Sequence, residues 1–237
     1  MTFLEHLEEL RFRLIKSALA LIVFSGISFL YRRDILEILK GRYFLLFREG
    51  ALENLVSIYP AESFVSGIKL SLFGGMILSF PYIAYQALAF ILPGLKKTEK
   101  KFIFPLLLST VFFFLSGALT AYLIILPAAL NFLLNQDASI LNMTSVNSYI
   151  TFSARLIAAF GFAFEIPVLC FILARSGIVT TRVLLSWSKY AIIMIFVLSA
   201  ILTPPDVVSQ IMLAVPLILL YFLGIAAARF ASGEKNA

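Results

Sequence analysis

Long apolar stretches separated by short polar segments dominate the pattern of this chain. A helix that crosses a bilayer needs about 20 apolar residues, each of which adds about 1.5 Å of length. Six stretches reach or approach that length, and the predicted spans are 14–31, 68–92, 102–126, 149–174, 188–202 and 209–228. The last two are short, and a tight turn at 203–206 joins them. The pattern therefore predicts an all-α membrane protein in which residues 1–237 form a single integral membrane domain.

Proline lies inside or at the ends of several predicted spans, at Pro81, Pro105, Pro127, Pro167 and Pro216. Each proline removes a backbone hydrogen bond and tends to kink its helix. Bends in this number favour a kinked, cupped bundle with a concave face over straight parallel rods. Kinks that serve only the packing of the helices are the alternative.

The orientation follows from lysine and arginine in the connecting segments. Six spans place both termini on the same side, and basic residues are more numerous on that side than on the other. Both termini are therefore expected in the cytoplasm. The segment 32–67 weakens this bias because it is also basic, although acidic residues accompany its charges. It is expected to be an outer loop in which 43–47 lies on the membrane surface or packs on the bundle.

Composition agrees with the pattern, since 61% of the residues are apolar and only 14% are charged. A soluble globular chain has about 25% charged residues, and a chain this apolar lacks the polar surface to cover itself. A cytosolic enzyme, a nucleic-acid module and a disordered hub are thereby excluded. The net charge of +6 needs no nucleic-acid partner, because the basic residues lie between the apolar runs where membrane topology explains them.

The sequence lacks the residues that several kinds of catalysis and metal binding require. The sequence contains no glycine-rich phosphate loop, so no nucleotide hydrolysis is expected. His6 is the only histidine, which excludes a histidine-based metal cluster and a serine–histidine triad. We therefore expect no catalytic residues, no metal, no cofactor and no enzymatic activity.

Two carboxylates in basic surroundings are the first candidate site. Glu9 stands four residues before Arg13, and a helical ion pair between them is its structural interpretation. Glu5 also stands at helical spacing from Glu9, an arrangement of like charges that helix stability alone would not choose. Glu99 is the single carboxylate in a lysine-rich loop, where it can simply neutralise its neighbours. If Glu9 and Glu99 converge, they form a site suited to planar guanidinium groups.

A second set of polar residues lies in or beside the later spans. Glu165 stands inside the fourth span, where a charge costs at least about 2.5–3.5 kcal/mol, so a functional role is expected for it. A protonated or hydrogen-bonded core residue is the alternative. Thr203, Asp206 and Gln210 form a polar cluster at the outer end of the last hairpin, and ordinary capping by Asp206 of the final helix would explain part of it.

The chain resembles the TatC family, the multispanning receptor of the twin-arginine protein translocase. The blocks that carry the resemblance, in order, are Phe3–Arg13, Pro60–Phe64 with Lys69, Tyr85–Phe90, Pro93–Glu99, Phe160–Pro167 and Leu202–Asp206. Any one block is weak, but all of them in order are a specific signal along nearly the whole chain. The resemblance implies a cupped bundle of six helices in the cytoplasmic (inner) membrane of a prokaryote.

The resemblance also implies roles for particular residues. Glu9 and Glu99 would hold the paired arginines of a signal peptide on the cytoplasmic face, with Arg11 and Phe90 nearby. Glu165 would face the concavity as the buried polar residue. The partner-docking residues would be Thr203, Gln210 and Asp206, close to the small single-span proteins TatA and TatB. Export of folded proteins would draw on the proton motive force, in a larger complex where the chain associates with further copies of itself.

A secondary transporter for a small solute is the alternative from another functional class. The carboxylate of Glu165 within a span and the kinked helices favour it, with Glu165 as a proton-coupling site. The spans show no internal repeat, however, and a transporter of this kind leaves Glu9 and Glu99 without a role. The residues themselves therefore favour the receptor.

Overall fold

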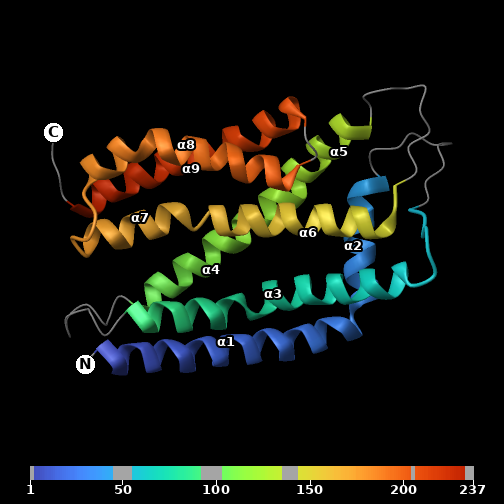
Figure 1. The fold of residues 1–237 in the computed structure, drawn as a ribbon, viewed down its shortest axis with the longest axis horizontal. Helices are drawn as coiled ribbons and strands as arrows, with labels where there is room; N and C mark the ends of the chain where they lie inside the picture. The colour runs from blue at the N-terminus through green and yellow to red at the C-terminus, as the bar shows by residue number, and fades with distance from the viewer. Residues whose placement is uncertain (1–2, 45–54, 92–102, 135–143, 204–205, 233–237) are drawn as a thin grey trace. The chain divides into compact units, whose positions relative to one another are not determined.

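The computed structural model describes residues 3–44, 55–91, 103–134, 144–203 and 206–232, which are almost entirely helical (Figure 1). Within these residues, six helical stretches are long and apolar enough to cross a membrane: Leu4–Leu30, Glu62–Phe90, Phe104–Leu133, Val146–Arg175, Thr181–Leu202 and Val207–Ser232. Extended structure in the same residues is limited to one isolated bridge between Val56 and Ser145. The predicted all-α fold with six membrane helices is confirmed, while its concave outline stays a prediction.

The first of two compact units comprises residues 1–41, 56–112 and 145–151. In it, α1 (Phe3–Leu30) packs along α3 (Glu62–Ile91), and the start of α1 lies beside the end of α3 (Figure 1). The two helices nearly touch at Gly75, where an added Cβ would lie 2.5 Å from the Cα atom of Ser25. Only a residue without a side chain permits this approach, which is a common device for packing helices in lipid.

A helix that the sequence did not predict follows α1. Residues Arg32–Phe44 form α2, where we expected a loop with a short surface piece. Its residues are too polar and too few to span a membrane, so hydropathy alone gave no signal for it. The buried residue Leu39 holds α2 in the first unit, because its carbonyl oxygen accepts a hydrogen bond of 2.6 Å from the Tyr149 hydroxyl.

The second unit comprises residues 42–55, 113–144 and 152–237. The helices α4 (Ile103–Thr120) and α6 (Val146–Ala163) begin in the first unit and continue into the second. The two helices approach closely at Gly117, where an added Cβ would lie 2.6 Å from the carbonyl oxygen of Phe160. The Phe114 ring packs beside Gly161 in the same contact.

Proline breaks two of the long helices, whereas Pro81 and Pro216, where bends were also predicted, lie inside the unbroken helices Glu62–Ile91 and Val207–Ser232. The π-helical segment η3 (Ala121–Ile125) links α4 to α5 (Leu126–Leu134), and it ends two residues before Pro127, whose ring would clash with the carbonyl one turn earlier in a regular helix. A break at Phe164 and Glu165 separates α6 from α7 (Ile166–Arg175), with Pro167 in the first turn of α7. Each break therefore ends two residues before the proline that causes it.

The last two helices, α8 (Thr181–Leu202) and α9 (Val207–Ser232), form a hairpin (Figure 1). The helix α8 begins seven residues before the predicted span, since the Thr180 side chain caps it by accepting a hydrogen bond from the Val183 amide. The early part of α8 carries the charged residues Arg182 and Lys189, so a search for long apolar runs misses the start of this helix. Its 22 residues span about 33 Å, enough for a bilayer core.

Candidate functional site

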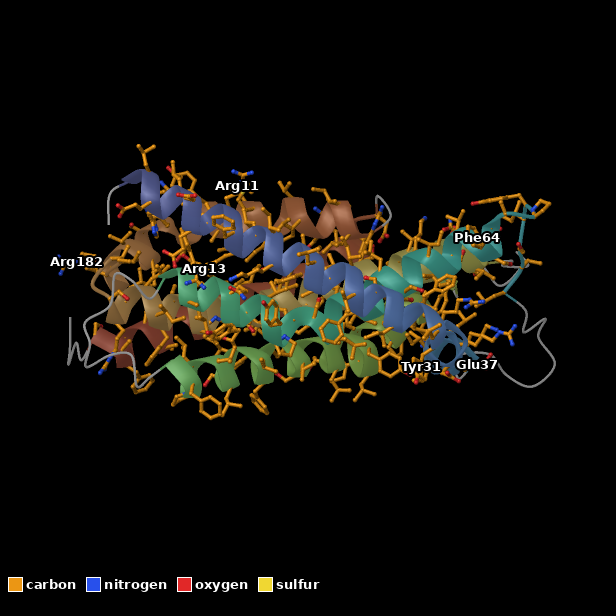
Figure 2. The ribbon with its side chains drawn as sticks, turned by 90° about the horizontal axis from the view of Figure 1, so that it is seen from below. Arg11, Arg13, Tyr31, Glu37, Phe64 and Arg182 are labelled. Atoms are coloured by element: carbon orange, nitrogen blue, oxygen red, sulfur yellow. The ribbon has the colours of Figure 1, made fainter. Side chains whose placement is uncertain are left out.

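The start of α1 and the end of α3 are joined by a chain of polar contacts. Glu9 accepts hydrogen bonds from Arg13 on its Oε1 atom, at 3.0 Å from Nε and 2.5 Å from Nη2. The Nη1 atom of Arg13 reaches across to Oε1 of Gln86 on α3, at 3.2 Å. Arg13 therefore lies between the two helices (Figure 2) and fixes the position of the Glu9 carboxylate. The expected ion pair between Glu9 and Arg13 is present.

An aromatic pair lies beside Glu9 in the same region. The ring of His6 stacks on the ring of Phe90, with centroids 4.3 Å apart and an angle of 11° between the planes. His6 also places its Nδ1 atom 3.8 Å from Oε2 of Glu9. This Oε2 atom is covered, and it has no hydrogen-bond donor among the described residues. Among the described residues, one oxygen of Glu9 is thus held by Arg13, while the other accepts no hydrogen bond.

The structure brings together only part of the predicted binding set. Glu9 and Phe90 lie in one cluster because His6 contacts both. Arg11 is exposed and points away from this cluster (Figure 2). Glu99 lies outside the described residues, so its convergence with Glu9 stays a prediction. Sequence reasoning did not single out His6 and Gln86 as site residues, although both lie within blocks that carry the family resemblance.

Glu165 lies at the break between α6 and α7 and is only 7% exposed. Its backbone makes a tight turn, since its amide donates to the carbonyl of Phe162 at 3.1 Å and its carbonyl accepts from Leu169 at 2.8 Å. The buried position agrees with the expected polar residue inside a span. Its role in transport stays a prediction.

The predicted polar cluster of the last hairpin stabilises the hairpin itself. Thr203 donates to the carbonyl of Ser199 at 2.8 Å, and the side-chain amide of Gln210 donates to the carbonyl of Phe196 at 3.0 Å. Asp206 caps α9, because its Oδ1 atom accepts from the Ser209 amide at 2.7 Å. Hydrogen bonds from the Ser209 hydroxyl and amide hold the pKa of Asp206 below its usual range. Docking of partners at these residues stays a prediction.

A second buried carboxylate, which sequence reasoning did not single out, lies at the start of α3. Glu62 is fully buried and accepts three hydrogen bonds, from the Ile58 amide at 2.5 Å, the Ser145 hydroxyl at 2.6 Å and the Asn147 amide at 2.9 Å. Beside it, the Lys69 ammonium donates to the Asn147 side chain at 2.8 Å. Glu62 therefore ties the segment before α3 to the start of α6.

Metal binding finds no support in the part of the chain that the structure describes. No group of three or more histidine, cysteine, aspartate or glutamate side chains gathers there in a way that could hold an ion. The cluster around Glu9 combines a carboxylate, the guanidinium of Arg13 and an aromatic pair.

The family model described as Sec-independent protein translocase protein (TatC) matches residues 5–216 of this chain. A Sec-independent protein translocase protein TatC from Aquifex aeolicus (strain VF5) is 41% identical over 239 residues, covering 100% of this chain and 98% of the relative. One from Helicobacter pylori (strain ATCC 700392 / 26695) is 40% identical over 227 residues, covering 94% of this chain and 86% of the relative.

Solved structures agree with the sequence comparisons. A crystal structure of a twin arginine translocase receptor, TatC, superposes with a TM-score of 0.88 at 40% identity, covering 96% of this chain and 99% of that one. A second crystal structure of the receptor, in DDM, superposes with a TM-score of 0.86 at 41% identity, covering 93% of this chain and 98% of that one.

Proposed function

Because the chain belongs to the TatC family of Sec-independent protein translocase proteins, we propose that it binds the paired arginines of signal peptides at the surface around Glu9. This surface, the Glu9 surface, consists of His6, Glu9, Arg13, Gln86 and Phe90. The family is one of protein translocase components, so the chain is a multi-pass membrane protein of the twin-arginine pathway and not an enzyme. Folded passenger proteins would be its cargo.

The unused oxygen of Glu9 is the observation that carries the proposal. A buried acceptor without a donor costs about 1–3 kcal/mol, and a ligand that supplies the donor recovers this free energy on binding. Within the described residues, Oε2 of Glu9 has no such donor. A guanidinium of the ligand would donate to Oε2 while Arg13 keeps Oε1, so binding would complete a carboxylate that is already oriented.

The neighbours of Glu9 favour arginine over lysine. A guanidinium is flat and donates along a fork, whereas an ammonium is a compact point charge that matches neither a carboxylate edge nor an aromatic face. The stacked pair of His6 and Phe90 offers such a face beside Oε2. A guanidinium would therefore gain both a charge-assisted hydrogen bond and a stacking contact, and an ammonium would gain only the first.

Glu99 would take the second arginine of the pair. In sequence it follows Phe90 by nine residues, and nine residues span at most about 30 Å. The lysines beside Glu99 would repel a cationic peptide except where the carboxylate neutralises them. Arg11, exposed on the outer side of α1, would contact an acceptor elsewhere on the peptide.

The remaining roles follow from the family and are part of the same proposal. Both termini would lie in the cytoplasm and the helices in the inner membrane. TatA and TatB would dock near Thr203 and Gln210, and several copies of the chain would assemble. Since the hydroxyl of Thr203 and the amide of Gln210 are used within the hairpin, partner helices would contact the adjoining apolar surface of α8, where Val197, Leu198 and Ile201 are exposed.

Peptide binding to the purified full chain in detergent tests the proposal. A signal peptide with two arginines is compared with the same peptide carrying two lysines, and the variants are Glu9→Gln and Glu99→Gln. Glu8→Gln is the matched control, because Glu8 is an exposed carboxylate on the same helix. We expect arginine-selective binding that both variants lose and the control retains. Equal affinity for the two peptides, or binding that survives Glu9→Gln, would contradict it.

A further inference from the structure

A cavity with a volume of about 360 Å³ lies between the start of α8 and the end of α9. Both helices belong to the second unit, and none of the residues around the cavity takes part in the Glu9 surface. The side chains that matter for its chemistry are Thr181, Arg182, Leu185, Phe222, Ile225 and Arg229. We call it the α8–α9 cavity. Its volume is in the range of cavities that hold a small organic group.

One end of the α8–α9 cavity is strongly basic. It carries the guanidinium groups of Arg182 and Arg229, and neither makes an ion pair or a side-chain hydrogen bond with any described residue. Figure 2 shows Arg182 extending outward from the start of α8. The first turn of α8 adds a partial positive charge and the last turn of α9 a partial negative charge, so the net positive charge comes from the two arginines. Two arginines without a counter-charge among the described residues form an environment for an anion.

A buried hydroxyl without a partner is the second, independent sign of a ligand. Thr181 lines the cavity and is only 7% exposed, yet its Oγ1 atom has no hydrogen-bond partner among the described residues. The neighbouring Thr180 already caps α8, so the hydroxyl of Thr181 is not needed for that purpose. A buried hydroxyl left without a partner costs free energy, which an oxygen of a bound anion would restore.

The other end of the cavity is apolar, with Leu185, Phe222 and Ile225 as its walls. Further along α8, Trp187 and Tyr190 are exposed and pack edge to face, with centroids 6.1 Å apart. Exposed tryptophan and tyrosine mark the headgroup level of a bilayer. Trp187 lies about 9 Å along the helix from Thr181, so the basic end of the cavity falls at or beyond the headgroups.

Contacts outside the cavity fix the position of α9 relative to α7 and α8. The Tyr221 hydroxyl donates to the carbonyl of Leu184 at 2.7 Å, which fixes α9 against α8. Cys170, Ala174 and Ala228 form a buried cluster that packs α7 against α9 on the other side. These contacts hold α9 against its neighbouring helices beside the cavity.

We propose that the α8–α9 cavity binds an anionic phospholipid, with its phosphate between Arg182 and Arg229 and in reach of the Thr181 hydroxyl. The acyl chains lie along Leu185, Phe222 and Ile225. Membrane topology explains two arginines on the cytoplasmic side of a span, but it requires neither a cavity between them nor a buried hydroxyl that lacks a partner. The ligand chemistry is a phosphate ester with net negative charge next to apolar chains.

Native mass spectrometry of the delipidated full chain tests this assignment by titration with phosphatidylglycerol and with phosphatidylcholine. We expect tighter binding of phosphatidylglycerol, and an Arg182→Gln/Arg229→Gln variant that loses roughly 10- to 30-fold of that affinity. Thr181→Val should lose roughly threefold. Lys16→Gln/Lys189→Gln is the control, because it removes the same two charges elsewhere and should leave the affinity unchanged.

Two further measurements complete the test. An Arg182→Lys/Arg229→Lys variant retains the charges and should keep most of the selectivity, which separates lost binding from lost folding. Inorganic phosphate is added as a soluble competitor, and a lipid site should retain phosphatidylglycerol in its presence. Equal affinity for the two lipids, an equal loss in the lysine control, or displacement by inorganic phosphate would overturn the assignment.

Discussion

Two glutamates in opposite states lie at the two ends of α3, Glu62 at its start and Glu9 of α1 beside its end. At its start, Glu62 is fully buried and all of its contacts are satisfied, by two backbone amides and a hydroxyl. Beside its end, Glu9 has one oxygen held by Arg13 and one with no donor among the described residues. Both are glutamates in the same unit, but Glu62 is fully buried whereas the Glu9 side chain is 18% exposed.

The difference lies in whether the protein itself completes the hydrogen bonds. A carboxylate whose hydrogen bonds are all made inside the fold stabilises the folded state, and it has little capacity left to accept a hydrogen bond from a ligand. A carboxylate that is held in place but has one oxygen without a donor can still accept a hydrogen bond from a ligand. We therefore assign Glu62 to stability and Glu9 to binding, and substitutions should separate the two roles.

The largest effect on stability is expected for Glu62→Ala. The change leaves two amides and a hydroxyl without their acceptor in a buried place, so the midpoint of thermal unfolding should fall by about 5–10 °C. Circular dichroism of the purified protein in detergent measures it. The affinity of the remaining folded protein for a twin-arginine peptide should not change. A fall in peptide affinity without a fall in the midpoint would reverse the assignment.

The reverse pattern is expected for Glu9→Gln. The loss of a partly buried charge that faces a guanidinium should lower peptide affinity at least about 30-fold. The unfolding midpoint should move by less than about 2 °C, since the amide oxygen of the introduced glutamine still accepts from Arg13. Isothermal titration calorimetry with the peptide and a parallel melt measure both quantities. A large fall in the midpoint would show that Glu9 is as structural as Glu62.

A smaller effect is expected for Gln86→Leu. Gln86 touches Arg13 and not Glu9, so it acts on the site by positioning Arg13. Removing one hydrogen bond of this kind should weaken peptide binding by roughly three- to tenfold. The same titration checks the value, and the preference for arginine over lysine should persist. Loss of that preference would mean that Gln86 itself contacts the ligand.

The smallest effect concerns Asp206, a satisfied carboxylate outside the spans. Its pKa is lowered by hydrogen bonds from Ser209, so the folded state favours the charged form. The stabilisation is complete above the unfolded pKa of about 3.9 and is lost as the pH falls through the lower folded pKa. Melts across that window should show the loss in the native chain and a weaker pH dependence in Asp206→Asn, which keeps an uncharged cap. Identical pH profiles would contradict the assignment.

The sequence alone predicted the structural features that depend on residues close to one another along the chain. The six spans follow from apolar run length, the breaks before Pro127 and Pro167 from proline chemistry, and the pair of Glu9 and Arg13 from helical spacing. The cap by Asp206 followed in the same way. Each is a local rule, so no knowledge of the fold was needed.

Contacts between distant residues could not be predicted in this way. The Ser145 and Asn147 donors of Glu62 stand more than 80 residues away, so no spacing rule connects them. The contact of Arg13 with Gln86 depends on how α1 and α3 align. Arg182 and Arg229 were counted only as topology signals, because a cavity between two helices has no signature in one sequence.

The close approach of α1 and α3 at Gly75 has a mechanical consequence for the peptide site. About 18 Å of helix separate Ser25, which touches Gly75, from Arg13. A tilt of about 3° at that crossing displaces α1 at Arg13 by about 1 Å. That is enough to stretch the 3.2 Å contact of Arg13 with Gln86 beyond hydrogen-bonding distance. If the Glu9 surface binds the peptide as proposed, its geometry therefore depends on the helix contact at Gly75, about 18 Å away.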